Sequence, residues 1–360
     1  MEKEIKLMKG NEALAEAAIR EGVDGYFGYP ITPQSEVLEY LSAERPWLRT
    51  GMVVLQAESE VAAINMVYGG AGAGKRVMTS SSSPGISLKQ EGISYIAGAE
   101  LPCLIVNVVR GGPGLGTIQP SQSDYFQATK GGGHGDYRLI VLAPASVQEM
   151  ADFVAVGFDL AFKYRNPVMI LSDGAIGQMM EKVELPPTRP RFTMEEIKKN
   201  TPWATIGKPK TRERNIITSL DLDPARHERH NIKLQAKYKQ IEANEVKYEE
   251  FACEDADYLL VAYGTSSRIC QKSVQLARAE GIKLGLLRPI TLFPFPKKPI
   301  HRLGAQVKGV LTVEMSAGQM VEDVKLAVDG QVRVEHYGRM GGIIPSPVEI
   351  VDVLRQQFEV

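Results

Sequence analysis

The stretch LPCLIVNVVRGGPG, residues 101–114, decides the fold class. Its first nine residues are apolar apart from Asn107, and such a continuous run is typical of a strand buried on both faces of a sheet. Arg110 and a glycine-rich loop follow the run directly. Because doubly buried strands belong to parallel sheets covered by helices, the stretch predicts the interior of an α/β domain.

Five further short runs rich in β-forming residues flank this stretch, separated by helix-compatible segments or glycine-rich loops. They are GYFGY (25–29), MVVLQ (52–56), RVMTS (76–80), RLIVLA (138–143) and PVMILS (167–172). Residues 11–22 have apolar residues at helical spacing, with Asn11 as the expected N-cap and Gly22 at the end. The alternation predicts a doubly wound, mostly parallel sheet with helices on both faces.

Composition divides the chain into three parts. Residues 1–190 contain the α/β pattern, and residues 191–255 form a charged, partly helical connector. Within the connector, residues 226–251 are expected to form a long helix, and their interleaved acids and bases argue against nucleic-acid binding. Residues 256–360 return to alternating strands and helices, so we expect a second, smaller α/β domain there.

The bulk composition narrows the class of protein. The 42 basic and 43 acidic residues give a net charge of −1, so no global charge attracts nucleic acid or an anionic membrane. Three cysteines stand far apart without CxxC spacing, which argues against a zinc site, a disulfide framework or an iron–sulfur cluster in this chain. No apolar run approaches the roughly 18 residues of a membrane span, and we expect a cytoplasmic protein.

Two loops at strand ends are candidates for a ligand site. YPITP (29–33) follows a strand, with Thr32 as the expected N-cap and Pro33 as the first residue of the next helix. SSSSPG (80–85) follows another strand and precedes a helix that begins near Ile86. Ordinary turn chemistry explains each loop, but open parallel sheets also bind ligands beyond the carboxyl ends of their strands.

Four side chains offer candidate chemistry. Glu58 and Glu60 open an apolar helix, where the helix dipole favours acids and where a buried glutamate can serve as an acid–base group. Arg110 suits either a bidentate contact with a substrate carboxylate or an outward salt bridge. His134, in GGGHGDY (131–137), is either a pocket residue or a loop histidine.

The segment GGAGAGKR, residues 69–76, nearly matches the phosphate-binding loop of nucleotide-dependent enzymes. However, Arg76 stands where a hydroxyl should bind magnesium, and the segment follows a helix instead of a strand. We therefore interpret it as a glycine-rich end of the preceding helix. A nucleotide-dependent ligase stays as an alternative.

Five of these segments in order resemble the alpha subunit of 2-oxoacid:ferredoxin oxidoreductases. They are YPITP, SEVAAINMVYGG (59–70), SSSSPG, VVRGGPG (108–114) and GGGHGD (131–136). Residues 262–296 resemble the transketolase C-terminal-type domain of that family. The resemblance implies a pyrimidine-type thiamine-diphosphate domain followed by a transketolase C-terminal-like α/β domain. It also implies oxidative decarboxylation of a 2-oxoacid with coenzyme A, with electrons passed to ferredoxin.

The resemblance further implies roles for individual residues. Glu60 matches the family glutamate that hydrogen-bonds the aminopyrimidine ring, and Thr32 and Arg110 match the residues that meet the substrate's carboxylate and carbonyl. Further cofactor contacts are expected from Pro30, Ile31, Ser82 and Ser83. His134 is expected at the pocket entrance, near the substrate tail.

A complete thiamine-diphosphate site also needs a GDG motif, which is absent; SDG (172–174) and VDG (328–330) lack the leading glycine. No metal ligands are therefore assigned to this chain. A beta subunit is expected to supply Mg²⁺, the diphosphate contacts and a [4Fe–4S] cluster, with gamma and delta subunits and ferredoxin as further partners. The expected substrate is the branched-chain 2-oxoisovalerate, with 2-oxoglutarate as the alternative substrate. A non-catalytic scaffold subunit is an alternative function.

Overall fold

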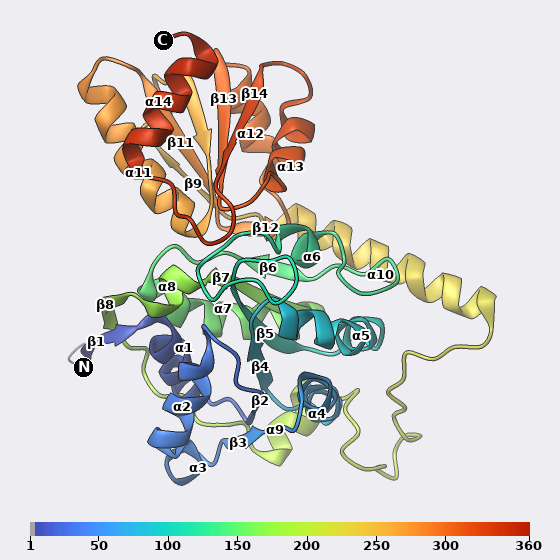
Figure 1. The fold of residues 1–360 in the computed structure, drawn as a ribbon. Helices are drawn as coiled ribbons and strands as arrows, with labels where there is room; N and C mark the ends of the chain where they lie inside the picture. Colours follow the sequence, from blue (N-terminus) through green and yellow to red (C-terminus); the bar gives the residue numbers. More distant parts are fainter. Residues whose placement is uncertain (1–3) are drawn as a thin grey trace.

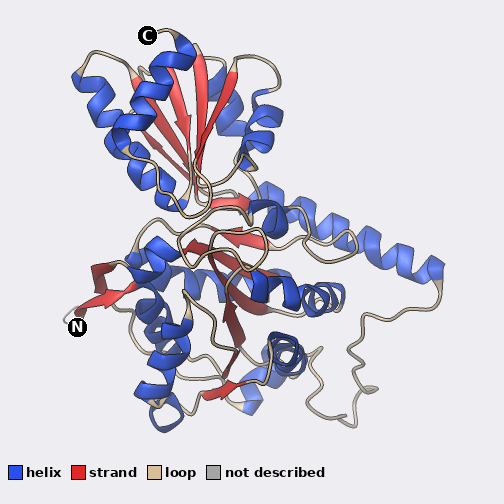
Figure 2. Ribbon diagram, viewed as in Figure 1, coloured by secondary structure: helices blue, strands red, loops and turns tan. Residues whose placement is uncertain are grey.

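The run of residues quoted first forms β5 (Cys103–Val109), near the centre of a seven-stranded sheet in the computed structural model, which describes residues 4–360 (Figures 1 and 2). All six predicted strand runs form this sheet, and their pairings are parallel. The strands, in order across the sheet, are β12 (Thr291–Phe293), β6 (Ile140–Leu142), β7 (Pro167–Asp173), β5, β4 (Val77–Ser81), β2 (Gly25–Gly28) and β3 (Val53–Gln56).

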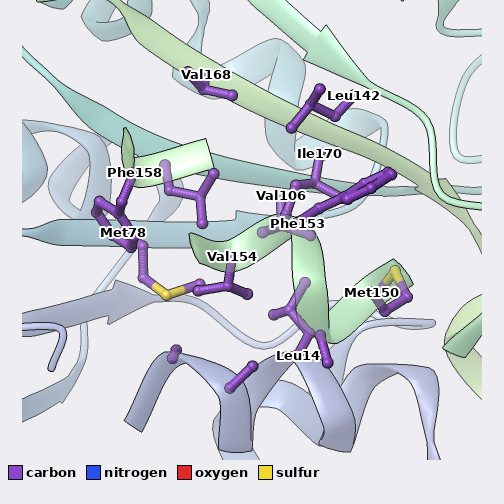
Figure 3. Close-up of a cluster of buried hydrophobic side chains, with 14 of the residues drawn as sticks. Leu14, Met78, Val106, Leu142, Met150, Phe153, Val154, Phe158, Val168 and Ile170 are labelled. Carbon is purple, nitrogen blue, oxygen red and sulfur yellow. The ribbon is translucent and has the colours of Figure 1, made fainter. Parts of the chain in front are cut away.

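Helices cover both faces of this sheet because its strands are apolar on both sides. Leu104, Val106 and Val108 of β5 belong to one hydrophobic core, whereas Cys103 and Ile105 belong to the other. Figure 3 shows Val106 among Leu14, Phe153 and Val154 in the first core. The helices of this part are α1 (Gly10–Arg20), α2 (Ser35–Glu44), α3 (Pro46–Arg49), α4 (Glu60–Gly72), α5 (Pro84–Gly98), α6 (Tyr125–Thr129), α7 (Val147–Tyr164) and α8 (Gly174–Gln178).

The order of strands fixes where a ligand site can lie. After β2 the chain places β3 along one edge of β2. It then crosses over and places β4 along the opposite edge of β2. Such a reversal separates the loops that leave the two neighbouring strands and opens a crevice at their carboxyl ends. The loops that leave β2 and β4 are YPITP and SSSSPG.

The C-terminal part forms a second α/β unit, as the sequence predicts, and its sheet has five strands (Figure 1). Its strands in order are β14 (Val334–Gly338), β13 (Gly309–Glu314), β10 (Tyr258–Val261), β11 (Leu284–Pro289) and β9 (Tyr248–Phe251). Its helices are α11 (Gly264–Ala279), α12 (Lys297–Gly304), α13 (Met320–Val328) and α14 (Pro347–Phe358). A separate two-stranded ribbon pairs β1 (Ile5–Lys9) with β8 (Met180–Glu184).

The segment between the two α/β parts contains α9 (Met194–Asn200) and α10 (Pro224–Asn244). The long helix is shorter at its C-terminus than the sequence predicts, because the residues from Tyr248 to Phe251 pair with β11 as an edge strand. Its packing face buries Leu234 and Tyr238, so α10 is not a wholly solvated arm. The division at residues 190 and 255 stays a prediction.

Two predicted helix starts are wrong. Helix α1 has Lys9 as its N-cap, and Asn11 lies inside the helix, where its amide donates to Pro33 O at 2.8 Å and to Glu36 Oε2 at 2.9 Å. Thr32 is not an N-cap and Pro33 is not helical, because a turn closed by Gln34 N donating to Ile31 O at 3.0 Å precedes α2. Asn11 and Pro33 are therefore held by a contact between segments, the hydrogen bond from the Asn11 amide to Pro33 O.

No helix within residues 4–360 is both long enough and apolar enough to span a bilayer.

Candidate active site

Arg110 and Ser83 join the loops that leave β5 and β4. The Ser83 hydroxyl accepts a hydrogen bond from Arg110 N at 3.1 Å and donates to Arg110 O at 3.2 Å. Ser83 N donates to the Oδ1 atom of Asn107 at 3.1 Å, and the Asn107 amide donates to Asp124 at 2.9 Å. Burial raises the pKa of Asp124, although hydrogen bonds from Asn107 and Ser83 oppose this. The turn before α5 is thus fixed to the end of β5.

The Arg110 guanidinium reaches the loop that leaves β2. Its Nη1 atom donates to Thr32 O at 2.9 Å, and its Nη2 atom donates to Leu115 O at 3.1 Å. The residue is 7% exposed and its buried Nε atom has no hydrogen-bond partner. Within residues 4–360 it forms no ion pair. Because buried charges in proteins are normally paired, this guanidinium is able to bind an anionic ligand.

The YPITP loop is held against the sheet by Gln34. Its amide donates to Tyr29 O at 3.1 Å, and its Oε1 atom accepts from the Ser80 hydroxyl, which also bonds to Tyr26 at 2.7 Å. Pro30 and Ile31 lie between these anchors. The loop therefore presents the half-buried Ile31 and the exposed Thr32 at the end of β2.

Glu60 is the first residue of α4, after the N-cap Ser59, whose hydroxyl accepts from Ala62 N at 3.2 Å. Glu60 is 7% exposed, and its carboxylate accepts no hydrogen bond within residues 4–360. A Cβ atom built on Gly85 would lie 2.9 Å from Glu60 Oε1 and 2.1 Å from Ser81 Oγ. Glu60 and Ser81 therefore both contact the first turn of α5.

His134 lies elsewhere. Its ring packs edge-on against Tyr95 at 5.9 Å between centroids, and its backbone oxygen accepts from Ser94. About ten residues of helix separate Tyr95 from Gly85, a rise of about 15 Å. His134 lines a pocket of about 530 Å³ with His227 and His230 of α10. The structure thus brings Thr32, Ser83 and Arg110 together but not His134, whose substrate role stays a prediction.

Comparison with known families identifies the family of this chain. Residues 16–250 match the family described as pyruvate flavodoxin/ferredoxin oxidoreductase, thiamine diphosphate-binding, and residues 256–350 match core domain II of pyruvate:ferredoxin oxidoreductase. This chain belongs to the 2-oxoacid:ferredoxin oxidoreductase family. It is an alpha-type subunit of this oxidoreductase family, as its motifs predict.

Relatives cover nearly the whole chain. The ketoisovalerate oxidoreductase subunit VorB of Methanothermobacter marburgensis is 53% identical over 355 residues, covering 99% of this chain and 97% of the relative. The 2-oxoglutarate synthase subunit KorA of Archaeoglobus fulgidus is 38% identical, with coverage of 97% and 99%.

Solved structures confirm the α/β fold. A 2-oxoglutarate:ferredoxin oxidoreductase from Magnetococcus marinus, with 2-oxoglutarate, coenzyme A and succinyl-CoA bound, matches with a TM-score of 0.84 at 30% identity. The match covers 99% of this chain and 66% of that one. A split-gene transketolase matches with a TM-score of 0.61 at 13% identity, which shows the fold alone.

The site of this oxidoreductase subunit fits a polar cofactor such as thiamine diphosphate. The Ser81 and Ser82 hydroxyls are buried without a hydrogen-bond partner, and the Glu60 carboxylate accepts no hydrogen bond within residues 4–360. Gly85 lets the Ser81 hydroxyl and the Glu60 carboxylate approach the first turn of α5 more closely than a Cβ atom would allow. Buried polar groups in native proteins are nearly always bonded, so these atoms indicate a ligand with matching donors and acceptors.

The GGAGAGKR segment does not form a phosphate-binding loop in this subunit. Its first four residues complete the last turn of α4, and Ala73 N donates to Gly69 O. Lys75 pairs with Asp24 at 3.3 Å. The carboxyl end of a helix presents carbonyl oxygens, which repel phosphate. The alternative of a nucleotide-dependent ligase therefore has no support in this geometry.

Sequence reasoning missed Lys89, Asn107 and Asp124. Lys89 falls on the buried face of α5 with Ile86 and Ile93, so helical spacing alone could have identified it as a buried charge. Nothing in the local sequence indicates the contacts of the other two with the β4 loop. Within residues 4–360, no group of three or more His, Cys, Asp or Glu side chains is placed to hold a metal ion.

Proposed function

We propose that this chain holds the aminopyrimidine end of thiamine diphosphate and the carboxylate of a 2-oxoacid, in a complex that converts a branched-chain 2-oxoacid and coenzyme A to acyl-CoA and CO₂. Electrons pass to ferredoxin. The substrate expected is 2-oxoisovalerate. The 53% identity to a ketoisovalerate oxidoreductase subunit, against 38% to a 2-oxoglutarate synthase subunit, supports this choice.

The observation that carries the proposal is the buried guanidinium of Arg110, which forms no ion pair within residues 4–360. It is fixed by backbone carbonyl oxygens of two loops and has a free buried Nε atom. A 2-oxoacid brings a carboxylate that can complete the ion pair, and the planar guanidinium orients that carboxylate. Thr32, whose backbone oxygen accepts from Arg110, lies on the YPITP loop and adds a hydroxyl that can hydrogen-bond the substrate's oxygen atoms.

When bound, thiamine diphosphate supplies the nucleophilic carbon that attacks the 2-oxo group. Glu60 would hold a proton at a ring nitrogen of the aminopyrimidine, since its buried carboxylate has no competing hydrogen bond within residues 4–360. Contacts from Pro30, Ile31, Ser82 and Ser83 would orient the same ring. Ser83 also fixes the backbone of Arg110, which couples the cofactor position to that of the substrate.

A pocket beside Thr32 is consistent with an apolar substrate tail. It has a volume of about 640 Å³ and is lined by Pro33, Ile118 and Ile344 together with two acids, Glu36 and Glu39. Burial raises the pKa of Glu36, but hydrogen bonds from Gln178 and Asn11 outweigh it and hold that pKa below its ordinary value. A charged Glu36 would repel the second carboxylate of 2-oxoglutarate.

The remaining parts of the reaction are proposed to come from partner subunits. A beta subunit would bring Mg²⁺, the diphosphate contacts and a [4Fe–4S] cluster, and gamma and delta subunits would complete the complex. We also propose a cytoplasmic location, where ferredoxin is available as the electron acceptor.

The test is to co-express this chain with its neighbouring subunits and assay 2-oxoisovalerate, 2-oxoglutarate and pyruvate with coenzyme A and a viologen acceptor. We expect kcat/KM for 2-oxoisovalerate to exceed that for 2-oxoglutarate by at least about tenfold. A complex inactive with every 2-oxoacid would overturn the proposal, and a preference for 2-oxoglutarate would favour the alternative substrate. Unchanged turnover in Glu60→Gln would instead indicate a scaffold.

A further inference from the structure

Asn107 is a buried polar residue in the otherwise apolar strand β5. It is 0% exposed and falls on the same face of the strand as Ile105 and Val109. Its amide donates to Asp124 Oδ2 at 2.9 Å, and its Oδ1 atom accepts from Ser83 N at 3.1 Å. Because buried amides in proteins are bonded, these two contacts explain a polar side chain at this position of the strand. Each contact joins β5 to a different loop.

Ser83 has an unusual backbone conformation, with a φ of 21° and a ψ of −80°. A positive φ is unfavourable for residues other than glycine, so this conformation persists only where surrounding contacts hold it. The hydrogen bond from Ser83 N to Asn107 is one such contact, and the two bonds between the Ser83 hydroxyl and the backbone of Arg110 are two more. Asn107 therefore helps to hold Ser83 in the orientation in which it contacts Arg110.

Arg110 is the first residue after β5, and its place depends on these contacts. Its N and O atoms both bond to the Ser83 hydroxyl, at 3.1 and 3.2 Å, and its guanidinium donates to the backbone oxygen atoms of Thr32 and Leu115. Within residues 4–360 no acidic side chain pairs with the guanidinium. The position of the guanidinium is therefore set by the backbone of Arg110 and by the loops around it.

We propose that Asn107 is a positioning residue for the 2-oxoacid, because through Ser83 it fixes the backbone of Arg110 so that the guanidinium meets the substrate carboxylate. Asp124 has the supporting role of orienting the Asn107 amide. A carboxylate only accepts hydrogen bonds, so Asp124 selects the orientation in which the amide nitrogen faces it and Oδ1 faces Ser83 N. The inference rests on the proposed function and goes beyond it by assigning the placement of Arg110 to Asn107 and Asp124.

Exchange of the two side chains separates their contact from the residues themselves. Asn107→Asp places a carboxylate opposite Asp124, so two acceptors face each other and repel. Asp124→Asn alone keeps an oxygen atom that can accept from the Asn107 amide. The double variant Asn107→Asp/Asp124→Asn forms the pair again with donor and acceptor exchanged, and it leaves an oxygen atom at residue 107 for Ser83 N. It should therefore recover part of what Asn107→Asp loses.

Asn166 provides a matched control. It is 0% exposed, and its amide donates to Arg138 O and to Pro167 O at 3.0 Å. It precedes β7, at the opposite end of the sheet from the loops that contain Arg110 and Ser83. Asn166→Asp therefore measures the general effect of exchanging a buried amide for a carboxyl group in this protein.

The experiment compares these variants with the wild type in the complete complex. The value of kcat/KM is measured for 2-oxoisovalerate and for coenzyme A, each with the other substrate saturating. Coenzyme A has no carboxylate to bind at Arg110, so it reports general damage to the complex. Ser83→Ala removes the hydroxyl that bonds to Arg110 and is a second variant, in case Asn107→Asp does not fold. Thermal denaturation shows whether each variant is folded.

In Asn107→Asp and in Ser83→Ala we expect kcat/KM for 2-oxoisovalerate to fall roughly tenfold and kcat/KM for coenzyme A to change by less than about twofold. The double variant should recover at least about threefold of the loss in Asn107→Asp, and Asn166→Asp should leave the ratio of the two values unchanged. Equal losses for both substrates, wild-type values in Asn107→Asp, or no recovery in the double variant would overturn the inference. If the wild-type complex converts no 2-oxoacid, the proposed function fails first.

Discussion

At the scale of single residues, the site depends on polar groups whose partners lie far away in the sequence. Arg110 contacts Thr32 across 78 residues, and Lys89 contacts Glu60 across 29. The motifs and the family resemblance identify Arg110, Thr32 and Glu60 as candidates. The sequence could not show that Arg110 lacks an acidic partner among the described residues 4–360, because that depends on every side chain that the fold brings near it.

Arg110→Lys keeps the positive charge but removes the planar fork. We expect KM for the 2-oxoacid to rise about 10- to 100-fold, because a charge-assisted hydrogen bond contributes about 1.5–3 kcal/mol. Steady-state kinetics of the complex measures this change. Arg302→Lys, at an exposed position on α12, is the matched control and should leave KM unchanged. An unaltered KM in Arg110→Lys would show that the carboxylate is bound elsewhere.

Lys89 also makes stability depend on pH. Its folded pKa of about 8 lies below the ordinary value of 10.5, so between these values the unfolded chain holds more protons than the folded one. The free energy of unfolding should therefore rise with pH across this window, by roughly 2–3 kcal/mol from this group. Lys89→Met should flatten the rise, measured by denaturation at about pH 7, 8, 9 and 10. Equal slopes in both proteins would contradict a charged, buried Lys89.

At the scale of elements, the turn between β4 and α5 determines the geometry of the site. The predicted strands are present in the structure because short apolar runs bounded by glycine-rich breaks are a direct sequence signal of buried strands. Helix starts were less predictable: Asn11 and Pro33 have good local signals for a helix start, but contacts between α1, α2 and the YPITP loop outweigh them. A capping side chain contributes only about 0.5–2 kcal/mol to helix stability, and tertiary contacts easily exceed this contribution.

Gly85→Ala tests this turn. The new methyl group would lie 2.1 Å from Ser81 Oγ and 2.9 Å from Glu60 Oε1, so one of them must move. We expect thiamine diphosphate affinity to fall at least about tenfold, measured by calorimetry on the complex. The control is Gly69→Ala on α4, where an added Cβ atom meets nothing within 4 Å. The control should bind normally and gain up to about 1 kcal/mol of stability. Equal affinities in the two variants would contradict the tight packing at Gly85.

At the scale of the whole molecule, two α/β parts are joined through buried polar contacts. Gln122, 2% exposed, donates to Tyr263 O at 2.8 Å and accepts from Ser266 at 2.7 Å and from Met315 N at 2.9 Å. The sequence predicts both sheets from their strand patterns. It does not predict this junction, because one glutamine in a polar loop carries no local signal for such contacts.

Gln122→Met should destabilise the chain, because it leaves the Met315 N–H and the Ser266 hydroxyl without their acceptor, and it removes one of the two hydrogen bonds to Tyr263 O. We expect a loss of about 2–4 kcal/mol in the free energy of unfolding, measured by denaturant titration. The control Gln271→Met, at an exposed position on α11, should change stability by less than about 0.5 kcal/mol. A small effect at Gln122 would mean that other contacts between the two parts, such as Tyr125 with Asp323 and Thr265 with Asp173, are sufficient to hold them together.

The strand β12 has a consequence for how this gene can be divided. Although it lies far along the chain, it pairs antiparallel with β6 at the edge of the first sheet. A polypeptide that stopped after residue 255 would expose the backbone groups of β6 as an open edge, which invites pairing between copies. Split expression of the two halves should therefore succeed only when the second half is present during folding of the first, and a fission of the gene at that boundary would make each product dependent on the other.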